Sequence, residues 1–329
     1  MSAAASPARG RALAAACLIA PLAIYAGVFQ HLAYRLGPAR GDVLPDAFAF
    51  AAAPGRIVAD LAAREAFLLA SAAMLVISVG ALVYALAGLH RSHGRPGLAA
   101  GALAALAFGG YAAATSGNPW RSHLVDRALA AAAEADALFA PLRTQGALDA
   151  IVLLDTFLGI GAVGAMILRF ASLALAEGDR PAARRHGAHA ARLAARERAV
   201  ARSLLAGALI LTSAAVATRI FYHLPAALME GEAAETHRAL AALAATRWGA
   251  AYTAILVGAA APAFLAVQLD LSDAVESGAL TSEEAAPLSG AGALGGPARA
   301  IGAVAAALGP AAVGPLLGVL ESALGAFAA

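Results

Sequence analysis

Residues 66–89 have the sequence AFLLASAAMLVISVGALVYALAGL, which contains no charged side chain. A helix needs roughly 20 apolar residues to cross a hydrocarbon layer about 30 Å thick, and this run is long enough. A second run, residues 248–269, is also uncharged and of similar length. Both predict transmembrane helices. Together they indicate the fold class, an all-α, polytopic helical membrane protein.

The composition of the whole chain agrees with a membrane protein. Its 329 residues are 61% hydrophobic and 13% charged, with a mean hydropathy of +0.74, whereas an average soluble domain has about 25% charged residues. These values exclude a disordered chain, a coiled coil and a disulfide-rich secreted module. The formal net charge of +2 gives no reason to expect a nucleic-acid partner.

All 23 basic residues are arginines. The absence of lysine excludes a retinal or pyridoxal Schiff base and a phosphate-binding P-loop, because each requires a lysine amine. Cys17 is the only cysteine, so a CxxC redox pair and an internal disulfide are also excluded. The Ala- and Arg-rich, lysine-free composition is typical of a GC-rich bacterial genome.

We predict a six-helix transmembrane domain over residues 1–270, with spans near residues 12–34, 66–89, 96–120, 150–168, 203–222 and 248–269. The first span is interpreted as a retained anchor. A cleaved signal peptide is the alternative, since Arg9 and Arg11 precede its apolar run. The longer connections, residues 43–65, 123–149 and 225–247, mix alanine and leucine with sparse charges and predict short helices in the outer loops.

Arginine placement predicts the orientation, because cytoplasmic loops carry an excess of basic residues. The connection between the fourth and fifth spans is the most basic segment, with Arg180, Arg184, Arg185, Arg192, Arg196, Arg198 and Arg202. Placing it inside puts both termini in the cytoplasm and the chain in a bacterial plasma (inner) membrane. The same segment is expected to attract anionic lipid.

The tail, residues 271–329, differs from the rest of the chain. Its acidic start is followed by a Gly- and Pro-rich linker and then by an apolar stretch, residues 300–327, that Pro310 and Pro315 interrupt. These prolines favour an interfacial or re-entrant helix in the tail, and a seventh span is the alternative.

One glycine motif invites a nucleotide-binding interpretation. Gly159, Gly161 and Gly164 match the GxGxxG pattern, but a dinucleotide site requires a strand before the glycines and a βαβ unit around them. The surrounding apolar run has the length of a helix. We therefore interpret the glycines as a small-residue face that lets helices approach closely.

Ionisable residues inside spans are costly, at about 2.5–3.5 kcal/mol on insertion scales. Asp155 lies near the outer end of the fourth span and Arg219 near the outer end of the fifth. Because consecutive antiparallel spans usually pack together, we predict an intramembrane ion pair between Asp155 and Arg219.

Three histidines recur at the outer ends of spans. We propose a candidate outer-face polar pocket lined by His31, His123, Asp155, Arg219 and His223. An interfacial belt of aromatic and polar residues is the alternative interpretation. No cofactor is expected. Zn or Cu at the outer-face histidines is the alternative, and the arginine would equally suit an anion.

Three classes of function remain. The leading hypothesis is a non-enzymatic scaffold or complex-associated subunit, with membrane proteins or a second copy of the chain as partners. A small-solute or ion permease is the first alternative, although few polar residues lie near the middle of the spans. A membrane enzyme or metal-binding protein that uses the outer-face pocket is the second alternative, without a recognisable catalytic signature.

Overall fold

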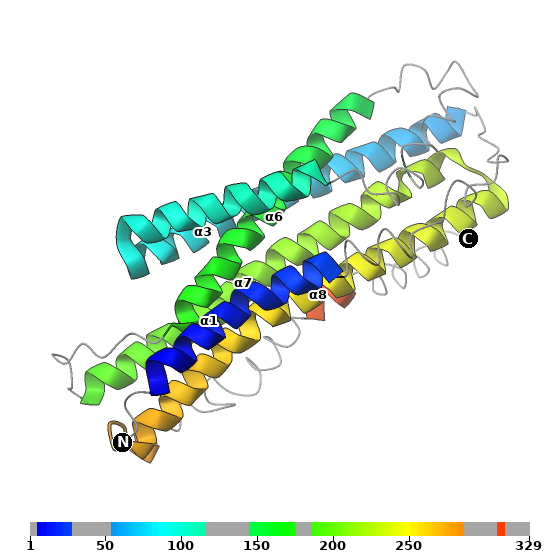
Figure 1. Cartoon of the computed structure of the whole chain (residues 1–329). Coiled ribbons are helices and arrows are strands. Elements are labelled where there is room, and N and C mark those ends of the chain that lie inside the picture. Colours follow the sequence, from blue (N-terminus) through cyan, green and yellow to red (C-terminus); the bar gives the residue numbers. More distant parts are fainter. Residues whose placement is uncertain are drawn as a thin grey trace.

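The computed structural model describes residues 5–27, 54–115, 125, 145–175, 186–285 and 308–312. The described part is helical and has no strand. Five helices are long and apolar enough to cross a membrane, so the prediction of a helical membrane protein is confirmed. Figure 1 shows them side by side in an elongated bundle. The elements are α1 (Ala5–Ile24), α3 (Pro54–Ala114), α6 (Gln145–Ala174), α7 (His186–His223), the 3-10 helix η5 (Leu224–Leu228), α8 (Gly231–Glu276) and the short α9 (Ser282–Ala285).

Helix α3 is a hairpin of two helical arms. Gly94 interrupts it with φ 65° and ψ −149°, a conformation that glycine adopts without steric cost. Pro96 follows in the first turn of the second arm, where a missing backbone N–H costs little. The arms touch beside the turn, since a Cβ added to Gly97 would lie 2.5 Å from the carbonyl oxygen of Leu89. Figure 1 shows the second arm returning beside the first.

Along the first arm, the residues that face the rest of the bundle are spaced alternately four and three positions apart. Such a seven-residue repeat keeps one seam of a helix against its neighbour over many turns. Most of the seam is fully buried, and its side chains range from charged at one end to small at the other. The seam consists of Asp60, Arg64, Phe67, Ser71, Met74, Ser78, Ala81, Ala85 and Gly88.

Helix α6 packs against both arms of the hairpin through its glycines. A Cβ on Gly159 would lie 2.6 Å from the terminal methyl of Met74 on the first arm. On Gly161 it would lie 2.9 Å from the carbonyl oxygen of Ala105, and on Gly164 2.7 Å from the Phe108 ring, both on the second arm. The GxGxxG motif therefore lies within a helix and serves close helix packing, as predicted.

Helices α7 and α8 are longer than the spans predicted within them. At 1.5 Å per residue, their 38 and 46 residues extend about 57 Å and 69 Å, against a hydrocarbon layer of about 30 Å. Hydropathy identifies only the apolar part, whereas alanine, leucine, glutamate and arginine continue the helix beyond it. Residues 231–247 of the predicted outer segment 225–247 form the first part of α8.

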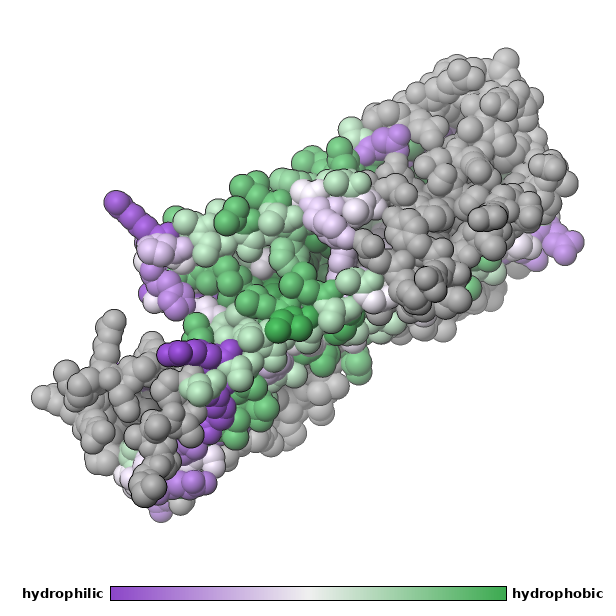
Figure 2. Space-filling view, in the orientation of Figure 1, coloured by the Kyte–Doolittle hydropathy of each residue, from purple (hydrophilic) through white to green (hydrophobic). Residues whose placement is uncertain are grey.

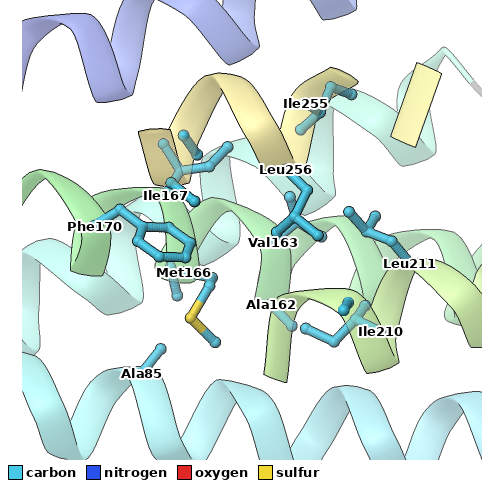
Figure 3. Packing of buried hydrophobic residues seen from close by; sticks show 14 of the residues in the cluster. Ala85, Ala162, Val163, Met166, Ile167, Phe170, Ile210, Leu211, Ile255 and Leu256 are labelled. Atoms are coloured by element: carbon cyan, nitrogen blue, oxygen red, sulfur yellow. The ribbon is translucent and has the colours of Figure 1, made fainter. Parts of the chain in front are cut away.

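The central core lies where α6, α7 and α8 meet (Figure 3). Val163 of α6 lies beside Leu256 of α8, and Ala162 of α6 lies beside Ile210 of α7. Gly207 permits this approach, because a Cβ there would lie 2.8 Å from Leu256 Cδ1. Many other core residues are alanines, so the core depends on short distances between backbones more than on large side chains.

Large apolar side chains also point outward over the middle of the bundle. Val76, Leu103 and Leu106 of α3 and Leu209 of α7 are all more than half exposed. Figure 2 shows this apolar surface over α1 and α3, with hydrophilic residues beyond it where α1 begins and α3 turns. An apolar band of this kind is the surface expected in contact with lipid.

Part of the tail lies along the bundle. The described residues 308–312 are helical, and the N–H of Ala311 donates to the hydroxyl of Thr253 at 3.2 Å. The carbonyl of Pro310 packs so closely on Gly249 that a Cβ there would lie 2.1 Å from its oxygen. Thr253 is about 25 Å along α8 from Asp270, so this segment lies well inside the length of the bundle. The rest of the stretch 300–327 lies outside the described residues, and its path stays a prediction.

Two adjacent glycines of α3 provide a test of this packing. A Cβ on Gly109 would lie 2.4 Å from the carbonyl oxygen of Phe157, whereas one on Gly110 would meet nothing within 4 Å. Gly109→Ala should destabilise the fold by about 1–3 kcal/mol, because the α6 backbone must move. Gly110→Ala should be neutral or stabilising by up to about 1 kcal/mol. Reversible unfolding in mixed micelles measures both, and equal effects would contradict the α3–α6 contact.

Candidate functional site

Charged side chains join α1, α7 and α8 at one end of the bundle. Arg9 of α1 donates to Asp270 at 3.3 Å and to Asp273, both on α8. Arg196 of α7 also donates to Asp270. We call this end, which contains Arg9, Arg169 and Arg196, the arginine end. The network links α1, α7 and α8 through one shared carboxylate.

Arg196 also reaches the end of α6. Its guanidinium donates to the carbonyl oxygens of Leu173 and Ala174. The last carbonyls of a helix have no partner within the helix and carry the negative end of its dipole, so a cation there is stabilising. The arginine pattern predicts a cytoplasmic basic segment that attracts anionic lipid, and in the structure Arg196 of this segment holds α6, α7 and α8 together.

Arg169 makes the corresponding contact between α6 and the hairpin. Its side chain is almost fully buried and donates to the carbonyl oxygen of Gly88 at 3.1 Å and to Ser92 Oγ at 2.8 Å. Gly88 leaves the space for it, because a Cβ there would lie 2.6 Å from Arg169 Nε. His93 Nε2 and Ser172 Oγ, 2.8 Å apart, add a second contact at the same level.

Sequence reasoning missed these residues for two reasons. Arg169 directly follows the predicted fourth span, where a charged residue looked like a simple boundary. Arg9 and Asp270 are separated by 261 positions, so nothing local connects them. The one available signal was the spacing of Asp270 and Asp273, three residues apart and hence on the same face of a helix.

The predicted outer-face pocket is described only in part. His31 and His123 lie outside the described residues. Asp155 on α6 is 6% exposed and Arg219 on α7 is 2% exposed, while His223 at the end of α7 is half-buried. The pocket as a set of five residues therefore stays a prediction, and so does Zn or Cu within it. Among the described residues, no group of three or more His, Cys, Asp or Glu side chains is placed to hold a metal.

The polar neighbour of Asp155 is a residue of α3. The hydroxyl of Ser71 lies near its carboxyl group, and neither Ser71 Oγ nor Asp155 Oδ1 has a hydrogen-bond partner among the described residues. Ion pairs among the described residues include those of Arg9, Arg64 and Arg196 with Asp60, Asp270 and Asp273. The pairing of Asp155 with Arg219 stays a prediction.

A buried histidine lies at the opposite end of the bundle from the arginine end. His237 of α8 is completely buried, and its Nε2 donates to the carbonyl oxygen of Tyr222 on α7 at 2.9 Å. Aromatic rings surround this connection, with Phe67 and Phe221 centroids 5.3 Å apart. The hydrogen bond fixes the turn through η5 between α7 and α8. His237 was not among the predicted site residues, because a single histidine in an Ala-rich segment carries no pattern.

Comparisons of this chain with protein-family models, with curated proteins and with solved structures found no match.

Arg196 and Arg198 are a matched pair for testing the network at the arginine end. Arg196 bonds to α6 and α8, whereas Arg198 on the same helix is exposed. Arg196→Gln should lower the free energy of unfolding by about 1.5–3 kcal/mol, the range for hydrogen bonds to charged groups. Arg198→Gln should change it by less than about 0.5 kcal/mol. Equal losses from the two variants would mean that Arg196 acts only through general charge.

Proposed function

We propose that the chain is a non-enzymatic scaffold that associates with a partner membrane protein beyond the bilayer surface. The observation that supports this proposal is a set of exposed apolar side chains at the end opposite the arginine end. Val58 and Leu61 of α3 are 67% and 52% exposed, and Leu243 of α8 is 59% exposed. We call these three residues the distal apolar surface.

The distal apolar surface lies farther along the bundle than the apolar band that we expect to contact lipid. Along α3, Val58 lies about 45 Å and Leu61 about 40 Å from Gly88 at the arginine end. Along α8, Leu243 lies about 40 Å from Asp270. A hydrocarbon layer that starts at Gly88 or Asp270 is about 30 Å thick. It therefore ends before it reaches the distal apolar surface. Apolar side chains exposed beyond the lipid tails are favoured where a protein partner covers them.

Cross-linking from defined positions tests the scaffold proposal. A photo-reactive phenylalanine analogue placed at Leu61 or Leu243 should give a discrete protein adduct when native membranes are illuminated. Leu103 is the matched control, because it is 68% exposed within the lipid band and should label lipid only. An adduct of twice the chain's mass would identify a second copy as the partner. Lipid adducts alone at all three positions would contradict the proposal.

A permease of ions or small solutes is the second candidate, and one observation favours it. The α3–α6 interface contains the buried hydroxyls of Ser71 and Ser78 and the buried carboxyl group of Asp155. Transport sites usually combine such polar groups with interrupted helices. Pro262 lies within α8, but the helix continues through it. The scaffold is therefore the function we favour.

We further propose the orientation predicted from the arginines, in a bacterial plasma membrane with the arginine end in the cytoplasm. Support comes from the convergence at this end of the start of α1, the turn of α3, the end of α6 and the end of α8. This arrangement is what a chain with both termini inside and alternating spans requires.

Reporter fusions test this orientation. A reporter fused after Arg192 should be active on the cytoplasmic side, and reporters after Ala133 and Glu232 should be active on the opposite side. A cytoplasmic signal after Glu232 together with an outside signal after Arg192 would reverse the orientation. Signals on one side at all three positions would contradict the alternating spans.

A further inference from the structure

Asp155 is an acidic residue deep in a helix interface with a single polar neighbour. It is 6% exposed, and the Ser71 hydroxyl that interacts with it is 2% exposed. The seam positions on either side of Ser71 are Phe67 and Met74, both buried and apolar. One turn along α6 from Asp155, a Cβ on Gly159 would touch Met74. The carboxyl group therefore lies in an apolar contact that contains one hydroxyl.

Two helices independently give the depth of this contact. Along α6, Asp155 is about 21 Å from Arg169, and along α3, Ser71 is about 25 Å from Gly88. Arg169 bonds to the carbonyl of Gly88, so both distances start from the same level. A layer about 30 Å thick that begins there includes Asp155. An ionised carboxylate at this depth requires a cation or several hydrogen-bond donors.

The surroundings provide Asp155 with one hydroxyl and no ion pair among the described residues. Asp60 and Arg64, further along the α3 seam, pair with each other at 2.7 Å. Other titratable or charged groups on elements packed against this half of α6 include Glu65 and Tyr111 of α3, Tyr25 after α1, Arg219, Tyr222 and His223 of α7, and His237, Arg247 and Tyr252 of α8.

We propose that Asp155 is a proton-binding site and holds its proton as a neutral carboxylic acid in the α3–α6 interface. In this state the O–H of the acid donates a hydrogen bond to Ser71 Oγ. The acid proton, which would be costly to bury without an acceptor, then has one. A neutral acid requires no cation, and its remaining oxygen costs far less to bury than a charge. This site is independent of the distal apolar surface.

Infrared spectroscopy of the full chain in lipid vesicles at neutral pH tests this site directly. A protonated carboxylic acid has a C=O stretching band above the protein amide bands, and the band shifts in D2O. The difference between wild type and Asp155→Asn should contain this band. Carboxylate bands in its place would overturn the proposal.

Two serines provide a matched control that does not require Asp155→Asn to fold. Ser71 interacts with the carboxyl group, whereas Ser78, 1% exposed, lies two helical turns further along the same seam. Ser71→Ala should move the acid band to higher frequency, because its hydrogen bond is lost. Ser78→Ala should leave the band in place. Identical spectra for the two variants would overturn the assignment.

Arg219→Gln separates the neutral acid from the predicted ion pair. If Asp155 already holds a proton, this variant keeps the acid band at its wild-type intensity. If Asp155 is ionised by Arg219, the wild type lacks the band and Arg219→Gln creates it. The second result would overturn the proton-binding site and establish the ion pair.

Discussion

The close approach of α6 to both arms of the α3 hairpin is the contact on which the rest of the bundle depends. At Gly109 and Gly161 the backbones come so near that a Cβ has no space, and at Gly164 a Cβ would meet the Phe108 ring. Helices in lipid gain little from burying apolar side chains, because the tails are equally apolar, so short-range packing of small residues must hold them together. With one side of α6 placed between the arms, its other side, including Val163 and Met166, is left for α7 and α8.

The arginine end complements this packing with directional contacts. Glycine contacts bring helices together but do little to prevent them from sliding, since many small residues are interchangeable. Arg169 at Gly88 sets α6 against the hairpin, and Arg196 sets the end of α6 against α7 and α8. Each contact combines a charge with a backbone carbonyl, which depends on the position of one residue. Glycine packing thus brings the helices close together, and the arginine contacts fix how far each helix is shifted along its neighbour.

Hydropathy was sufficient to predict the helical membrane fold, and the turn at Gly94 lies in the gap between the predicted spans 66–89 and 96–120. Helix lengths could not be predicted, because α7 and α8 continue through charged, Ala-rich segments that hydropathy treats as loops. Sequence gives the depth of a residue along its helix, which suggested Arg219 as the partner of Asp155. The rotation of α6 about its axis decides which neighbours Asp155 meets, and this rotation cannot be predicted from hydropathy. The structure has Ser71 near Asp155, and the pairing with Arg219 stays a prediction.

The seam of α3 shows how sharply polarity follows depth in this protein. Asp60 and Arg64 pair with each other about 36–42 Å from Gly88, beyond a 30 Å hydrocarbon layer that starts there. Between them and Gly88, the polar side chains of the seam are the hydroxyls of Ser71 and Ser78, which are small and uncharged. The helix facing this stretch nevertheless carries a carboxyl group. In the neutral form that we propose, this carboxyl group adds no buried charge, so the contact between α3 and α6 at this depth stays uncharged.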